Sequence, residues 1–366
     1  MTTTTWFNLS RRHKVWRPRP LRWVLQDMAG VARQPEQAHR THLRATLEWL
    51  CRAQDASRSI PGSVAAGWTF ASGWLPGNMD VAGRLIETCL PAADYLAWPE
   101  LRSRARGMLD TLLAQPDTPS VGRIQGLIAG HLQLDHPESL ARAVRSGQAL
   151  LEAPAHAADQ HVHAAHMLAR LGSLSGSEAF QDAARRHLDA ALGLQTPSGW
   201  FPGARVPTST STLAGIIRGL IESAHLLDEP RALQAGRRAA QAMYDLLHGD
   251  GWLAGAYDDG WTPAAAHACM PGLAQLAGVW LRLAQRGEDA HWHDAAWRAL
   301  AWIKRNQRTM GDDLALRDAL PSAVPIWRGP AAFRFDAMSA KYFSDALMMD
   351  MVGIAIPPIA QKVESA

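Results

Sequence analysis

The sequence is poor in cysteine, in signal-like segments and in long apolar runs. Its three cysteines, Cys51, Cys89 and Cys269, form no CxxC pair, which excludes a disulfide framework and a cysteine-rich zinc module. No stretch approaches the roughly 18 uninterrupted apolar residues of a membrane-spanning helix, so an integral membrane protein is not expected. The first 20 residues lack the apolar core of a secretory signal, and we therefore expect a cytoplasmic location.

Charge is nearly balanced, with 37 basic and 34 acidic residues and a net charge of +3. No basic groove interleaved with aromatic residues is present, so no nucleic-acid partner is predicted. The basic residues concentrate only in residues 1–30, which we predict to be an arm outside the main domain, at Arg11, Arg12, Lys14, Arg17, Arg19 and Arg22. This arm is either solvated or in loose contact with an anionic membrane surface.

Tryptophan is unusually abundant for a chain of 366 residues. The sequence has 15 Trp against 4 Tyr and 7 Phe, within an ordinary composition of 47% hydrophobic and 19% charged residues. A Trp ring offers a large apolar face and one N–H donor, which suits a pocket for sugars or long apolar chains. Some of these rings are expected to be core residues.

The apolar spacing is helical almost throughout. Leu43, Leu47 and Leu50 share one stripe of a helix over residues 42–54, and glycine and proline separate such segments. No alternating run is long enough to predict a strand with conviction. The sequence therefore predicts an all-α protein.

A loose internal repeat organises these helices. Each unit has a helix that ends in an apolar pair and then Gln (once His), followed in most units by a turn with Gly or Trp; the copies lie at 45–54, 105–115, 141–153, 183–201, 239–253 and 295–307. Between them lie helices rich in Gly, Ala and Ser, at 80–96, 122–134, 159–171, 208–227, 263–283 and 336–351. Six hairpins predict an (α/α)6 toroid, a ring of six inner helices inside six outer ones, over residues 31–356, with 357–366 as a tail. An open α-solenoid is the alternative.

Three segments carry a family resemblance. The turn of Gln followed by Gly-Trp is similar to the QW-type repeat of squalene-cyclase and prenyltransferase-like toroids. Segments 53–86, 194–227 and 322–349 more closely resemble toroid proteins encoded in bacterial exopolysaccharide biosynthesis clusters, and the resemblance extends over most of residues 40–352. It implies an (α/α)6 toroid that serves surface-polysaccharide production. Where such relatives tend to carry Pro-Glu, this chain has Met79 and Asp80.

In such a ring, the loops that lead into the inner helices all open at one end, and the candidate site lies there. The catalytic candidates are Asp80 and Asp336, from the first and last units, with Asp259 as a further acid. The substrate-binding candidates are Trp68, Trp74, Asn78, Arg123, His163, Trp200, Tyr257, Trp261, His267, Trp327, Arg334 and Lys341.

These residue types are the ones a glycan site needs. Flat rings stack on sugar faces, Arg and Lys bind anionic groups, and two carboxylates can act as general acid and base. Helix N-capping alone is an alternative explanation of Asp80 and Asp336.

Other chemistries lack their motifs. Asp159, His163 and His166 share a helical stripe without a metal signature, and neither a metal nor a cofactor is predicted. The Asp-x-Asp-Asp acid of a proton-initiated terpene cyclase is absent, since Ala256 and Met310 stand where its first Asp would be. Nucleophile-elbow, P-loop and dinucleotide motifs are also missing.

Three functional hypotheses remain. The first is a carbohydrate-active enzyme that acts on a glycan or lipid-linked oligosaccharide by hydrolase-like or lyase-like acid–base chemistry. The second is a non-catalytic protein of the polysaccharide assembly machinery that binds a glycan or its polyprenyl carrier. The third is an isoprenoid-handling enzyme, which requires an apolar cavity below the acidic residues.

Overall fold

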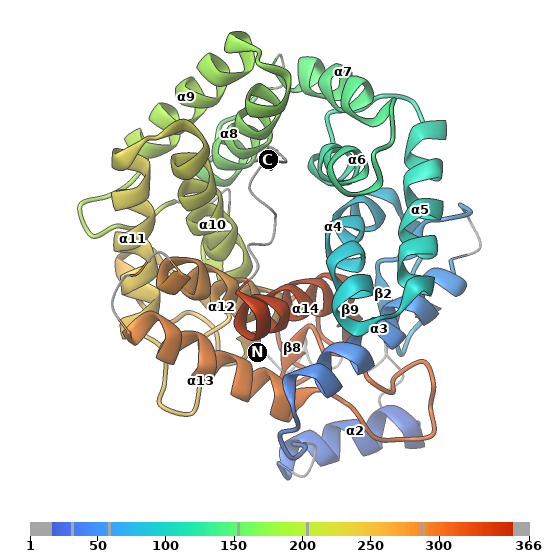
Figure 1. Ribbon diagram of the computed structural model, residues 1–366. Helices are drawn as coiled ribbons and strands as arrows, with labels where there is room; N and C mark the ends of the chain where they lie inside the picture. Colours follow the sequence, from blue (N-terminus) through green and yellow to red (C-terminus); the bar gives the residue numbers. More distant parts are fainter. Residues whose placement is uncertain are drawn as a thin grey trace.

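The computed structural model describes residues 17–30, 33–57, 60–151, 154–202, 205–285, 287 and 290–353. Six helices form an inner ring: α4 (Met79–Leu96), α6 (Val121–Leu134), α8 (Ala158–Ser175), α10 (Thr210–Leu227), α12 (Met270–Gln285) and α14 (Ala337–Val352). Six more surround them: α3 (His39–Asp55), α5 (Pro99–Ala114), α7 (Ser139–Leu151), α9 (Glu178–Gly193), α11 (Pro230–Asp245) and α13 (His291–Asn306) (Figure 1). The predicted (α/α)6 toroid is confirmed.

Small residues let the inner helices approach closely, as their composition predicts. A Cβ on Gly219 would lie 2.2 Å from a methyl carbon of Val162 in the neighbouring helix, and one on Gly272 would lie 2.6 Å from the backbone of Ser211. Gly83 and Gly122 face each other across the contact of α4 with α6, where a Cβ on either would lie 2.1 Å from a carbonyl oxygen. The glycines thus set the tight circumference of the inner ring.

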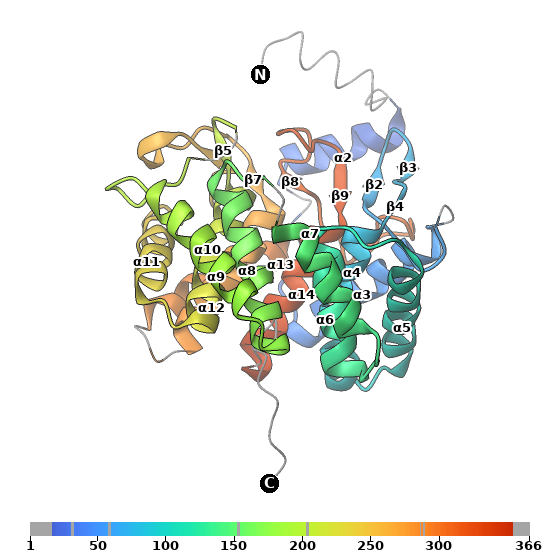
Figure 2. The ribbon, with the colours of Figure 1, turned by 90° about the horizontal axis from the view of Figure 1, so that it is seen from above.

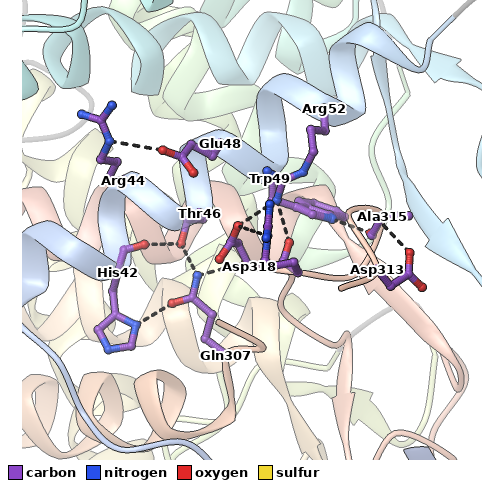
Figure 3. A network of polar contacts seen from close by, with 11 residues as sticks. His42, Arg44, Thr46, Glu48, Trp49, Arg52, Gln307, Asp313, Ala315 and Asp318 are labelled. Atoms are coloured by element: carbon purple, nitrogen blue, oxygen red, sulfur yellow. Dashed lines mark hydrogen bonds and ion pairs between the residues drawn. The ribbon is translucent and has the colours of Figure 1, made fainter. Parts of the chain in front are cut away.

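The glutamines of the repeat connect successive outer helices. Gln54 at the end of α3 donates to the carbonyl of Arg104 in α5, and Gln195 after α9 donates to the carbonyl of Ala235 in α11. Gln307 after α13 donates to the hydroxyl of Thr46 in α3 at 2.9 Å, so the same device joins the last unit to the first (Figure 3). The ring therefore closes, and the open solenoid is excluded.

Short strands gather at one end of the ring. The nine strands that the described residues contain are two or three residues long: β1 (Val64–Ala65), β2 (Gly67–Thr69), β3 (Gly73–Trp74), β4 (Gly77–Asn78), β5 (Thr208–Ser209), β6 (Ala256–Tyr257), β7 (Ala268–Cys269), β8 (Ala323–Val324) and β9 (Arg334–Asp336). They lie at the end where the inner helices begin, which we call the mouth (Figure 2). Strand β2 pairs with β9, with Gly67 opposite Asp336, so the first and last mouth loops also meet.

Two sequence expectations change in detail. The inner helix expected from residue 263 begins at Met270, because residues 263–269 run through a loop and strand β7 before the helix starts. Within the residues expected to form an arm, Pro18–Met28 is a helix, α2, whose Trp23 ring packs edge-on against Phe335 at the mouth. Residues 1–16 and 354–366, which include most of the basic arm and the predicted tail, lie outside the described part of the chain.

Candidate functional site

Asp80 lies in the first turn of α4, at the mouth. Its Oδ1 accepts hydrogen bonds from the Ser120 hydroxyl at 2.6 Å and the Gly122 amide at 2.7 Å, and its Oδ2 pairs with Arg84 at 2.8 Å. Burial acts to raise the pKa of Asp80, but the Arg84 charge and these hydrogen bonds outweigh it and hold that pKa below its ordinary value. The side chain remains 41% exposed, so an ionised carboxylate faces the mouth. Asn78, not Asp80, caps α4 by accepting from the Val81 amide.

Asp336 lies at the N-terminus of α14, the neighbour of α4 where the ring closes, at the capping position that Asn78 has in α4. It caps α14 by accepting from the Met338 amide at 2.8 Å, and Arg334 lies 3.2 Å from its other oxygen. Burial is the main influence and raises the pKa of Asp336 above its ordinary value, against the opposing effect of Arg334. The two acids thus lie at the N-termini of adjacent inner helices with pKa values displaced in opposite directions.

Polar side chains from the inner helices converge on the centre of the ring. A Cβ on Gly215 of α10 would lie 3.3 Å from Nε2 of His163 and 3.9 Å from Nε2 of Gln275. One side chain from α8 and one from α12 therefore both reach this glycine. Arg218, one turn further along α10, has its guanidinium 5.7 Å from the ring centre of Tyr342 in α14. Its Nη2 is buried and finds no hydrogen-bond partner among the described residues. We call His163, Arg218, Gln275 and Tyr342, together with Arg84, the central cluster.

His163 is neutral near pH 7. Burial, reinforced by the positive charge of Arg84, lowers its pKa to about 4, and Arg218 acts in the same direction. The deeper His166 is also displaced well below its ordinary pKa by burial. The net charge of the central cluster at neutral pH therefore comes from its arginines and is positive.

Buried ion pairs lie among the inner helices beside this cluster. Arg170 of α8 reaches across to Glu87 of α4 at 2.5 Å, although α6 stands between these helices in the ring. Arg282 and Glu222 pair at 2.8 Å, and Lys341 pairs with Asp345, which also accepts from Thr88; these three pairs form what we call the floor. A small pocket, with a cavity volume of about 20 Å³, is lined by Arg218, Tyr342, Arg282 and Met349.

The predicted aromatic residues lie in two groups. Trp68 is buried against Phe335, Trp74 packs on Trp49, and Trp327 packs against the core; all three belong to the walls of the mouth. In the loops that follow α9 and α11, the ring of the buried Trp200 meets the ring of Trp261 edge-on, with 5.0 Å between the ring centres. Trp261 is only half-buried, so it presents part of its ring to solvent.

The remaining candidates are spread over several environments. Arg123 is buried and bound to Asp117 and the Leu112 carbonyl, which holds the loop before α6 against α7. Tyr257 is buried in β6, His267 is half-buried against the glycine at position 329, and Asp259 is exposed in a short 3-10 turn, Asp259–Trp261. Lys341 lies in the floor with its charge paired.

The structure brings Asp80, Asp336, Arg334 and His163 toward one end and centre of the ring. Sequence reasoning missed Arg84, Arg218, Gln275 and Tyr342, and the whole floor except Lys341. One signal was available, because Arg218 and Glu222 lie within an otherwise apolar helix, GIIRGLIESAHLL. A charged residue surrounded by apolar neighbours on a helix indicates a buried polar contact. Among the described residues, no group of three or more His, Cys, Asp or Glu side chains is arranged to hold a metal ion.

Comparisons with known proteins establish the fold class. No protein-family model and no curated protein sequence matches this chain. Among solved structures, the unsaturated glucuronyl hydrolase of Bacillus sp. GL1, responsible for glycosaminoglycan degradation, aligns over 85% of this chain and 95% of its own, with a TM-score of 0.70 and 14% identity. The unsaturated glucuronyl hydrolase of Streptococcus agalactiae aligns over 88% of this chain and 94% of its own, with a TM-score of 0.70 and 12% identity. An unsaturated glucuronyl hydrolase specific for heparin aligns over 86% of this chain and 98% of its own, with a TM-score of 0.69 and 11% identity.

These similarities concern the whole ring. At such identities they show a shared fold and leave the activity of this chain to be argued from its own residues. In the part of the chain that the structure describes, no helix is long and apolar enough to cross a bilayer.

Proposed function

We propose that this protein is a carbohydrate-active toroid of exopolysaccharide biosynthesis that binds an acidic saccharide, free or lipid-linked, between its mouth and its central cluster. Asp80 and Asp336 then carry out acid–base glycosidic chemistry. The observation that supports this most is the opposite displacement of the two pKa values at adjacent helix N-termini. Such a pair supplies one ionised and one protonatable carboxyl at the same pH.

In hydrolysis, each acid has one role. Asp336 donates its proton to the glycosidic oxygen as the bond from that oxygen to the anomeric carbon breaks. Ionised Asp80 accepts a proton from a water molecule whose hydroxyl adds to the anomeric carbon. Both acids then recover their starting states by proton exchange with solvent.

The central cluster supports an anionic substrate. Arg84 is already paired with Asp80, but Arg218 has a buried N–H group with no hydrogen-bond partner in the described part of the chain. A guanidinium in that situation binds a carboxylate, sulfate or phosphate with two parallel hydrogen bonds. The half-buried Trp261 supplies an apolar face for a neutral sugar ring.

A non-catalytic, glycan-binding role is the second candidate. It is favoured by the hydrogen bonds that each acid already receives: Asp80 from Ser120 and Gly122, and Asp336 from the Met338 amide. The isoprenoid hypothesis needs an apolar chamber, and the ion pairs of the floor place buried charges among the inner helices, which does not favour one. The polyprenyl part of a lipid-linked substrate would consequently stay outside the ring.

The cellular setting is part of the proposal. The link to exopolysaccharide biosynthesis is supported by the three similar sequence segments, and the proposal places the protein in the cytoplasm. The basic residues near the N-terminus would hold the protein loosely at an anionic membrane surface, by long-range attraction.

Binding and turnover can be measured separately. Acidic oligosaccharides cut from the producing organism's own polysaccharide are tested for binding by calorimetry and for cleavage by new reducing ends or an unsaturated product. We expect cleavage by the wild type, tight binding without cleavage by Asp336→Asn, and weakened binding by Arg218→Gln. Asp110→Asn, at an exposed acid of α5, is the matched control and should behave as the wild type.

The outcomes separate the two candidates. Binding without cleavage by the wild type would establish the non-catalytic role. Equal affinity of the wild type and Arg218→Gln would refute the anion-binding role of the central cluster. No binding of any glycan would overturn the proposed function.

A further inference from the structure

Helix α2 is fixed to the mouth by one face. Its Asp27 forms a buried ion pair with Arg308 at 2.6 Å and accepts the Ile326 amide at 2.8 Å. Val24 is buried against Phe333, next to the contact of Trp23 with the mouth. Because this face is anchored at several points, the exposed flank of α2 next to it is held in a defined orientation.

That flank is apolar and exposed. Leu21, Leu25 and Met28, at helical spacing, are 40%, 55% and 68% exposed; we call them the apolar strip. Met310 lies in the loop across a groove from α2, is 72% exposed, and is followed by the exposed Leu314. Of the eight large apolar side chains that are strongly exposed among the described residues, five belong to α2 and this loop. Scattered exposed apolar residues need no explanation, but a cluster indicates a binding surface.

The charges beside the strip are mostly positive. Arg17 and Arg22 of α2 are exposed, and the half-exposed Arg317 lines the same groove. Asp312 and the half-buried Asp313 are the acids on the facing loop, whereas Asp27 is neutralised by Arg308. The chain preceding α2 adds Arg11, Arg12 and Lys14. An apolar strip bordered by arginines matches an anionic bilayer, where apolar side chains enter the acyl boundary and guanidinium groups stay with the headgroups.

We propose that α2 is an interfacial membrane helix, which inserts Leu21, Leu25 and Met28 into an anionic lipid surface and holds the mouth beside it. With 11 residues, the helix lies in the plane of the surface and does not cross it. This docking goes beyond electrostatic attraction by the basic arm, because it needs apolar insertion by residues of the folded ring. It deepens the proposed function in one respect, since the sugar of a lipid-linked substrate would reach the mouth while its lipid stays in the bilayer.

Vesicle flotation of the full-length protein tests this docking. Vesicles of phosphatidylglycerol mixed with phosphatidylcholine are compared with vesicles of phosphatidylcholine alone. We expect the wild type to float with the anionic vesicles and Leu25→Glu to bind about tenfold more weakly. Trp297→Glu, which changes an exposed apolar residue on α13, is the matched control and should float as the wild type does.

A second variant separates the strip from the arm. Replacement of Arg11, Arg12 and Lys14 by Gln should weaken binding mainly at low salt, while Leu25→Glu should weaken it at every salt concentration. The docking is overturned if the wild type does not float or if Leu25→Glu floats as the wild type does. It is also overturned if the wild type is a dimer and the effect of Leu25→Glu is to dissociate that dimer without weakening vesicle binding. Leu25→Glu should retain its melting temperature and its affinity for soluble oligosaccharide, so a failure here is distinct from a failure of the proposed function.

Discussion

The side-chain amide of Gln307 donates to the Thr46 hydroxyl and to the Asp318 carbonyl, so that one residue joins the last outer helix to the first. His42 completes this seam through its bond to the same side chain, and Arg52 holds the following loop by pairing with Asp318 at 2.9 Å (Figure 3). The seam determines whether residues near both ends of the chain can share a mouth. Asp80 and Asp336 are neighbours in the ring only because it closes here.

Replacing Gln307 by Ala should therefore destabilise the whole ring. The substitution removes the partner of the buried His42 Nδ1 and of the Asp318 carbonyl, and one of the two hydrogen bonds of the Thr46 hydroxyl. Each group left unpaired costs about 1–3 kcal/mol. We expect a loss of about 2–4 kcal/mol in the free energy of unfolding, measured by urea denaturation. Gln54→Ala is the control, because its bond of 3.4 Å is part-exposed and should matter less. Equal losses in the free energy of unfolding for the two substitutions would mean that the seam contributes no more to stability than the contact between α3 and α5.

The contact of α4 with α6 should be intolerant of any side chain. A Cβ on Gly122 would lie 2.1 Å from the Asp80 carbonyl oxygen, so Gly122→Ala forces two packed helices apart, at a cost of about 1–3 kcal/mol. Gly107→Ala is the control, since a Cβ there meets nothing within 4 Å and should stabilise α5 by about 0.5–1 kcal/mol. Thermal unfolding of both variants checks the pair. A destabilised Gly107→Ala would show that helix propensity does not govern this position.

The Glu87–Arg170 pair should behave as a buried ion pair that crosses the ring. Arg170→Met leaves Glu87 charged and fully buried, which we expect to cost about 3–5 kcal/mol. The double variant with Glu87→Leu removes both charges and should recover most of the stability. Unfolding of the two single variants and the double variant in urea forms a double-mutant cycle. A double variant whose loss of stability equals the sum of the two single losses would show that the pair is not coupled.

The sequence determines the ring more fully than it determines the site. Six hairpins, their small-residue inner helices and their terminal glutamines are local patterns, and Gln54, Gln195 and Gln307 indeed occupy equivalent positions. The centre of the ring depends on the rotation of each inner helix, which no local pattern specifies. Glu87 and Arg170, for example, are 83 residues apart and meet only after three inner helices are in place.

The same reason explains the different environments of the predicted site residues. Asp80 and Asp336 follow loops that end at the mouth, and chain position alone leads to them. Arg123 also begins an inner helix, but the register of α6 turns its guanidinium toward α7 and the loop at Asp117. Arg218 lies two turns inside α10, away from every loop, so a search along the mouth loops does not reach it, and its apolar neighbours are the one sequence signal of its burial.

His163 should make the protein less stable in weak acid. Its pKa is about 4 in the folded protein and 6.5 ordinarily, so between those pH values the unfolded chain binds a proton that the folded protein does not. The free energy of unfolding consequently falls as the pH is lowered from 6.5 toward 4. His163→Gln should reduce this slope, measured by urea unfolding at several pH values, whereas His156→Gln, at an exposed position, should leave it unchanged. Part of the slope should persist in His163→Gln because burial also lowers the pKa of His166. A slope identical to that of the wild type would mean that His163 is protonated in the folded ring, and the neutral central histidine would have to be abandoned.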